Sequence, residues 1–82
     1  MGTSLDQLAD GAHATVQGVH TDSPDLDAAM LRRLAELGFI AGEPVQVLRR
    51  GPGGRDPLAV RIGDTLFALR RAEARCIDVQ AD

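Results

Sequence analysis

Residues 31–47 read Leu31-Arg32-Arg33-Leu34-Ala35-Glu36-Leu37-Gly38-Phe39-Ile40-Ala41-Gly42-Glu43-Pro44-Val45-Gln46-Val47, and this stretch decides the fold. Met30, Leu34 and Leu37 lie at i, i+4 and i+7, a spacing that places them on one face of a helix. Gly38 follows directly, where helices commonly end in a left-handed residue. The alternation at Val45-Gln46-Val47 then predicts a half-buried strand, so a short connection joins one helix to a sheet.

The other segments predict further strands around this unit. Apolar and polar residues alternate over the predicted strands 12–19, 45–50, 58–62, 65–70 and 76–79. Gly18 interrupts the first strand and predicts a β-bulge there. Ser23 and Pro24 are a typical helix start, so the helix is expected to run from there to Leu37. Leu5 and Leu8 predict a helical turn or an irregular lead-in.

Five short strands with tight connections and one helix between the first two predict a mainly β fold. We expect a small, strongly bent, five-stranded β-barrel that forms one domain over residues 1–82. A barrel removes the exposed edges that so small an open sheet would present. The alternative is an open α+β sheet with the helix on one face. The glycine- and proline-rich segment 51–57 is expected to be an exposed loop between two strands.

Composition limits the classes of function. The net charge is −3 and every cation is an arginine at position 32 or later, which argues against a general binder of nucleic-acid backbones. Residues 1–6 lack the pattern of a signal peptide, and no segment approaches a membrane span, so we expect a cytoplasmic protein without membrane insertion. Cys76 is the single cysteine, which excludes an intrachain disulfide.

Several specific activities are disfavoured by the motifs. No helix or Lys-Ser/Thr ending follows the glycine-rich segment 51–57, so it does not resemble a phosphate-binding loop. Phe39 and Phe67 are the only aromatic residues, too few for a proline-peptide groove or a base-stacking platform. No nucleophile–base pairing or paired-carboxylate signature is present, so we expect that the protein is not an enzyme.

The ordered set of motifs resembles the FeoA family over nearly the whole chain. These are the small cytosolic accessory proteins of bacterial ferrous-iron transport, with an SH3-like barrel fold. The matching features are Leu5-x-x-Leu8 with Gly11, Arg33-Leu34-x-x-Leu37-Gly38-Phe39-x-x-Gly42-x-x-Val45-x-Val47, the loop 51–57, Val60-x-Ile62-Gly63, and Ala68-Leu69-Arg70-x-x-Glu73-Ala74-x-x-Ile77-x-Val79.

The resemblance implies a function in partner binding. Members of the family are thought to act on the membrane GTPase permease FeoB, so a FeoB-like permease is the implied partner and ferrous-iron uptake the implied process. The same module is similar to the C-terminal SH3-like domain of iron-dependent repressors. A metal-dependent regulatory module that interacts with a repressor or DNA is therefore the alternative function. With either function, the protein could form oligomers.

Five residues are candidates for partner binding. Leu31 lies off the predicted apolar stripe beside Arg32 and Arg33, so this helix face could be an exposed docking patch. A solvated face with weak ion pairs to Glu36 is the simpler interpretation. The segment 51–57 adds Arg55. Arg70 matches the Ala-Leu-Arg element of the family and could bind a partner, or its guanidinium could hold Glu73 at the strand end.

His13, His20 and Cys76 are the candidate ligands for a soft transition metal. His13 and His20 are seven residues apart and would lie on opposite faces of an unbroken strand, although a bulge at Gly18 could bring them to one side. Cys76 precedes the inward Ile77 and is expected to face outward or into a crevice. Three scattered residues do not form a recognisable metal motif, so no resident cofactor is predicted.

Overall fold

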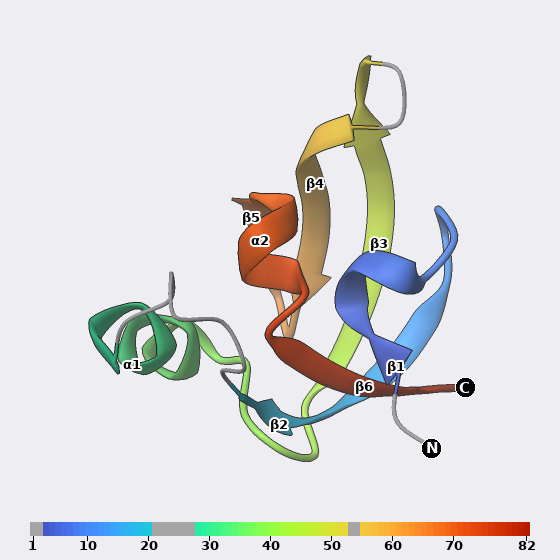
Figure 1. Cartoon of the computed structure of the whole chain (residues 1–82). Helices are drawn as coiled ribbons and strands as arrows, with labels where there is room; N and C mark the ends of the chain where they lie inside the picture. The colour runs from blue at the N-terminus through green and yellow to red at the C-terminus, as the bar shows by residue number, and fades with distance from the viewer. Residues whose placement is uncertain (1–2, 21–27, 53–54) are drawn as a thin grey trace.

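The structure is a computed structural model that describes residues 3–20, 28–52 and 55–82. Figure 1 shows a curved antiparallel sheet with helices packed beside it. The elements in chain order are β1 (Thr3–Ser4), the 3-10 helix η1 (Leu5–Gln7), β2 (His13–Val19), α1 (Ala28–Leu37), β3 (Pro44–Gly51), β4 (Arg55–Ile62), β5 (Thr65–Leu69), α2 (Arg71–Ala74) and β6 (Ile77–Ala81).

The sheet has six strands in the order β1-β6-β2-β3-β4-β5, and all neighbouring pairs are antiparallel. The expectation of a closed five-stranded barrel is wrong in two respects. The sheet contains the additional strand β1, which has only two residues and therefore no alternation to detect in the sequence. The terminal strands β1 and β5 are not paired with each other, so the sheet remains open.

The helices also differ in part from the prediction. Helix α1 is described from Ala28 to Leu37, and the expected start at Ser23 and Pro24 lies outside the described residues. The segment Arg71–Ala74, predicted as a single turn, forms the short helix α2, so the described part of the chain contains two α-helices and not one. Neither helix has the length and hydropathy to cross a membrane.

A β-bulge in β2 confirms the prediction at Gly18. Val16 lies opposite Val79, but Gly18 lies opposite Asp78, so Gln17 is an extra residue in the ladder. The bulge reverses the alternation of β2. As a result Val16 is buried, and Val19 also packs against the core from the far side of the bulge.

Helix α1 ends as the sequence predicts. Gly38 has a φ of +115°, a conformation that residues with a side chain rarely adopt. The Gly38 N–H donates to the carbonyl of Ala35 at 3.1 Å, and the Phe39 N–H donates to the carbonyl of Leu34 at 3.1 Å. These two bonds form a Schellman motif. It places Phe39 beside Leu34, and both side chains are only 1% exposed in the core.

The buried face of α1 differs from the predicted stripe. Leu31, Leu34 and Leu37 contact the core, whereas Met30 is half-buried without being among the residues packed against it. The spacing i, i+3 and i+6 also lies within one apolar stripe, so the sequence is compatible with either rotation of the helix. The interpretation of Leu31 as an exposed residue off the stripe is therefore wrong.

The β3–β4 hairpin extends further into the glycine- and proline-rich segment than predicted. Gly51 pairs with Arg55, so both belong to strands and not to the expected loop. A Cβ atom at Gly51 would lie 2.5 Å from the carbonyl oxygen of Asp56, which explains why glycine is required at this position. Register shifts in β3, between Val47 and Arg49 and again after Arg50, let the strand continue into this irregular sequence.

Candidate partner-binding surface

The arginines of α1 are exposed, as predicted for a docking patch and equally for a solvated face. Arg32 and Arg33 form no ion pair with Glu36 or with any other described residue. Their charges are therefore available to a partner. Leu31 does not belong to this patch in the predicted way, because it is half-buried and packs against the core.

Arg55 and Arg70 lie on other parts of the sheet. Arg55 begins β4 at the tip of the β3–β4 hairpin, and its side chain lies outside the described part of the structure. Figure 1 shows α1 and this tip at opposite ends of the molecule, so the predicted surface of helix face plus hairpin loop is not contiguous.

Arg70 follows β5 as the N-cap of α2, and its side chain is exposed. Arg70 contacts Glu73 as predicted, but through its backbone N–H and not through its guanidinium. The Arg70 N–H donates to Oε1 of Glu73 at 2.8 Å, which fixes the first turn of α2. The guanidinium forms no ion pair with a described residue.

The three candidate metal ligands do not form one group, although the backbone N–H of His20 donates to the carbonyl of Cys76 at 2.8 Å. His13 is exposed at the start of β2, whereas Nδ1 of His20, beyond its far end, lies 2.7 Å from Oδ2 of Asp78. The prediction that Cys76 faces outward or into a crevice is wrong, because it is 3% exposed and its Sγ donates to the carbonyl of Ala72 at 3.4 Å. The described residues contain no group of three metal-binding side chains.

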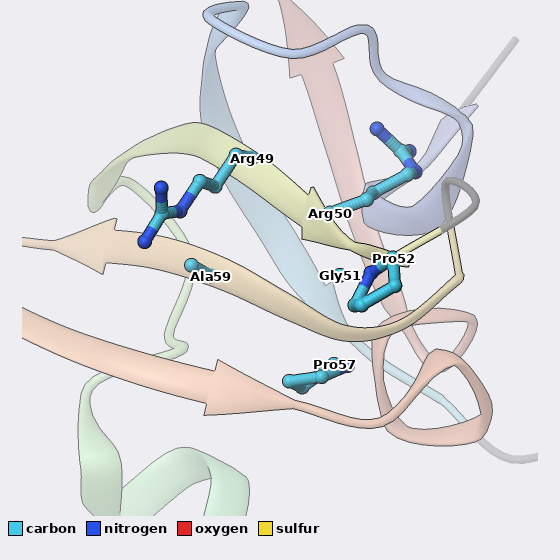
Figure 2. A pocket seen from close by; sticks show the side chains of 6 residues that line it. All are labelled: Arg49, Arg50, Gly51, Pro52, Pro57 and Ala59. Atoms are coloured by element: carbon cyan, nitrogen blue, oxygen red, sulfur yellow. The ribbon is translucent and has the colours of Figure 1, made fainter.

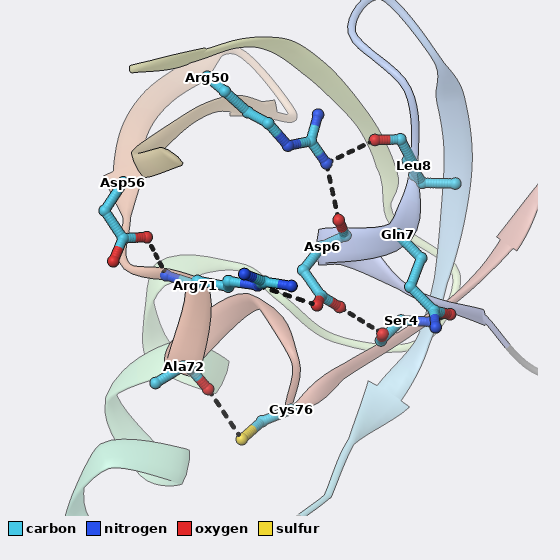
Figure 3. A network of polar contacts seen from close by, with 9 residues as sticks. All are labelled: Ser4, Asp6, Gln7, Leu8, Arg50, Asp56, Arg71, Ala72 and Cys76. Atoms are coloured by element: carbon cyan, nitrogen blue, oxygen red, sulfur yellow. Dashed lines mark hydrogen bonds and ion pairs between the residues drawn. The ribbon is translucent and has the colours of Figure 1, made fainter. Parts of the chain in front are cut away.

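Sequence reasoning missed the role of Arg50. Its Nη1 donates to Oδ1 of Asp10 at 2.7 Å. Its Nη2 donates to the carbonyls of Asp6 at 2.7 Å and Leu8 at 2.6 Å (Figure 3). The guanidinium thus ties the N-terminal segment to β3. Arg49 and Arg50 look equivalent in the sequence, but as consecutive strand residues they point to opposite faces, and the register shift between Val47 and Arg49 decides which of them faces outward.

The same network reaches α2. The carboxylate of Asp6 accepts a hydrogen bond from the Ser4 hydroxyl and lies 4.0 Å from Nε of Arg71 (Figure 3). The backbone N–H of Arg71 donates to Oδ1 of Asp56 at 2.6 Å. These contacts fix η1, α2 and the start of β4 relative to one another, so they explain several charged residues as parts of the scaffold.

A pocket of about 420 Å³ lies along the β3–β4 hairpin (Figure 2). Its lining residues are Arg49, Arg50, Gly51, Pro52, Pro57 and Ala59. Figure 2 shows the side chain of Arg49 extending from β3 towards β4, where Ala59 lies, while that of Arg50 points away towards η1. The pocket therefore combines the apolar surface of two prolines and an alanine with the exposed cation of Arg49.

These features define a class of protein. The chain is a small antiparallel β-domain in which some charged side chains, such as Arg50 and Asp10, stabilise the scaffold, while other arginines are exposed on the surface without an ion pair to a described residue. The FeoA domain model matches residues 3–81, which is nearly the whole chain. The chain therefore belongs to the FeoA family, in agreement with the resemblance of its motifs. None of the curated proteins matches it.

Solved structures support the fold. A zinc complex of FeoA from Stenotrophomonas maltophilia, described as an SH3-domain protein, has a TM-score of 0.79 and 40% identity, and the match covers 98% of this chain and 89% of that one. FeoA from Chlorobium tepidum has a TM-score of 0.81 and 35% identity, with 96% and 70% covered. The open six-stranded sheet is therefore SH3-like.

A manganese-dependent transcriptional repressor also contains this fold. Its TM-score is 0.80 at 26% identity, and the match covers 99% of this chain but only 42% of the repressor. The likeness is consequently confined to one domain of that protein.

Proposed function

We propose that this protein is a cytoplasmic, non-enzymatic accessory factor of ferrous-iron uptake that binds the cytosolic GTPase part of a FeoB-like permease and modulates transport. Membership of the FeoA family is the observation that carries the proposal. The Stenotrophomonas relative is described as possibly acting as a ferrous iron transport activating factor, which supports the same process.

The exposed arginines of α1 are the best-supported contact residues for the permease. Arg32 and Arg33 have no acidic partner among the described residues, so an acidic partner surface could engage them without breaking an internal ion pair. Arg55 and Arg70 remain candidates at the far hairpin tip and at the end of β5. Binding can modulate transport only if the protein has a higher affinity for one state of the permease than for another.

The test is calorimetric titration of the protein into the GTPase domain of the permease from the same genome. We expect binding whose affinity differs between GDP and a non-hydrolysable GTP analogue. Arg32→Glu and Arg33→Glu should each weaken binding, while Arg75→Glu, a change at the exposed C-cap of α2, is the matched control. Equal affinity in both nucleotide states would assign a scaffolding role, and absence of binding would refute the proposal.

The alternative function, a metal-dependent regulator, has no metal site to support it among the described residues. The zinc in the Stenotrophomonas relative and the manganese in the repressor belong to those proteins. In this chain His13 is far along β2 from His20, and Cys76 is buried. A stability increase on addition of Zn²⁺ or Fe²⁺ that disappears in His20→Ala would revive this alternative.

A further inference from the structure

The outer face of β3, β4 and β5 carries a cluster of arginines around small apolar residues. The register places Arg61 between Gln46 and Leu66, and places Ala59 between Arg49 and Ala68. These residues face away from the core, because their neighbours Val60 and Ile62 are buried. Residues two apart on a strand are separated by about 7 Å, so the two rows form one continuous patch.

The positive charge of this patch is uncompensated within the described structure. Arg49, Arg61 and Arg70 are all exposed and form no ion pair with a described residue. The nearby carboxylate of Asp56 is already occupied by the backbone N–H of Arg71. Three free cations on one face of a protein with a net charge of −3 indicate complementarity to a negatively charged partner.

The patch borders a free strand edge. β5 is the last strand in the sheet order and pairs only with β4. The two-residue turn Gly63-Asp64 makes Ile62 and Thr65 a hydrogen-bonded pair of the β4–β5 ladder. The next pair, Arg61 and Leu66, is therefore a non-hydrogen-bonded pair, and so is the pair of Ala59 and Ala68. The backbone N–H and C=O groups of Leu66 and Ala68 therefore point away from β4, towards the open edge of the sheet, and can form hydrogen bonds to another strand.

Exposed apolar surface marks the same edge. Leu66 is 60% exposed, and Ile40 at 48% is the other large apolar residue that is exposed in the described structure. At the other end of the patch, Pro57 and Ala59 line the pocket of about 420 Å³ beside Arg49 (Figure 2). An incoming strand that turns its acidic residues to this face turns its alternate, apolar residues to the opposite face, where Phe67 of β5 is half-buried against the core.

We propose that the β5 edge and the arginine patch form a docking site for an extended acidic segment of a partner protein, with alternating acidic and apolar residues. Backbone groups of Leu66 and Ala68 add the segment as a seventh strand. Arg61 and Arg70 bind its carboxylates, and Arg49, further from the edge on β3, adds to the positive potential of the patch. A second copy of this chain fits poorly, because edge-to-edge pairing would bring two arginine patches together.

The test is a titration of the isotope-labelled full chain with synthetic peptides, followed by amide chemical shifts. The probe is an alternating glutamate–valine heptapeptide, and its lysine–valine twin is the charge control. Two further glutamate–valine peptides carry N-methyl groups on every second backbone amide, one peptide on the odd-numbered amides and the other on the even-numbered amides. An edge strand pairs through only one set, so we expect one methylated twin to bind and the other to fail.

The glutamate peptide is expected to shift the amides of Leu66 and Ala68 saturably, and the lysine peptide is not. Arg49→Glu, Arg61→Glu and Arg70→Glu should each weaken binding by roughly fivefold or more, whereas Arg75→Glu should not. The proposal is overturned if the shifts occur elsewhere, if the lysine twin binds equally, if both methylated twins bind like the parent, or if a single-stranded oligonucleotide of equal charge binds more tightly. Since no permease is used, failure here leaves the proposed function untouched.

Discussion

The guanidinium of Arg50 donates a hydrogen bond of 2.6 Å to the main-chain carbonyl of Leu8, 42 residues earlier in the chain. The same nitrogen also binds the carbonyl of Asp6, and the other terminal nitrogen binds the carboxylate of Asp10. One side chain thus satisfies acceptors in a turn that has few backbone partners of its own. It keeps Leu5 and Leu8 buried in the core.

Replacing Arg50 should therefore destabilise the fold. Arg50→Ala leaves the carbonyls of Asp6 and Leu8 without their donor, and we expect a loss of about 1.5–3 kcal/mol in the free energy of unfolding. Arg50→Lys should restore only part of this loss, because a lysine lacks the planar fork. Urea denaturation measures both values. Arg49→Ala is the matched control, expected within about 0.5 kcal/mol of the parent since its side chain is exposed.

Gly38 should be sensitive to replacement for a conformational reason. A Cβ at this position would lie 3.6 Å from Cγ1 of Ile62, an ordinary contact, so steric overlap is not the main cost. The φ of +115° is the cost, and we expect Gly38→Ala to lose about 1–3 kcal/mol of stability by thermal or chemical denaturation. Ala41→Ser, an exposed change in the next turn, should have little effect. Equal stabilities would contradict the assigned helix end.

The two sides of α1 should respond differently to a negative charge. Leu31→Asp places a carboxylate at a half-buried position against the core and should cost about 1–3 kcal/mol of stability. Arg32→Glu changes an exposed neighbour and should stay within about 0.5 kcal/mol. Denaturation curves of the two variants compare them directly. If Leu31→Asp is as stable as Arg32→Glu, the rotation of the helix is wrong and Leu31 returns as a surface residue.

Cys76 should be protected from thiol reagents in the folded protein. Its side chain is buried and its Sγ is hydrogen-bonded to the carbonyl of Ala72, so labelling requires the fold to open. We expect a chromogenic disulfide to react roughly a hundredfold or more slowly with the native protein than with the protein in denaturant. Rapid labelling under native conditions would instead indicate an accessible thiol.

Local patterns predicted much of the scaffold. The alternation over β2, β3, β4, β5 and β6 identified these strands, and Gly18 and Gly38 marked the bulge and the helix end because each glycine has a conformational cause. The family motifs extended this prediction to the SH3-like fold.

The remaining features depend on tertiary contacts. β1 exists only because Thr3 and Ser4 pair with β6, a contact that no local pattern encodes. Whether Met30 or Leu31 faces the core depends on the packing of α1. Arg49 and Arg50 point to opposite faces by strand alternation, and the register shift between Val47 and Arg49 decides which of them faces outward. The arginine patch on the outer face combines residues from three strands, so the sequence alone could not assemble it.

The pairing of Thr3 with Val79 joins the first described strand to the last. β6 also separates β1 from β2, and β2 is bonded to it along most of its length. During synthesis, β1 and β2 therefore lack their shared neighbour until residues 77–81 have left the ribosome, and only then can the sheet be completed. Folding of this domain therefore requires residues 77–81, and contacts so distant along the chain favour slow folding.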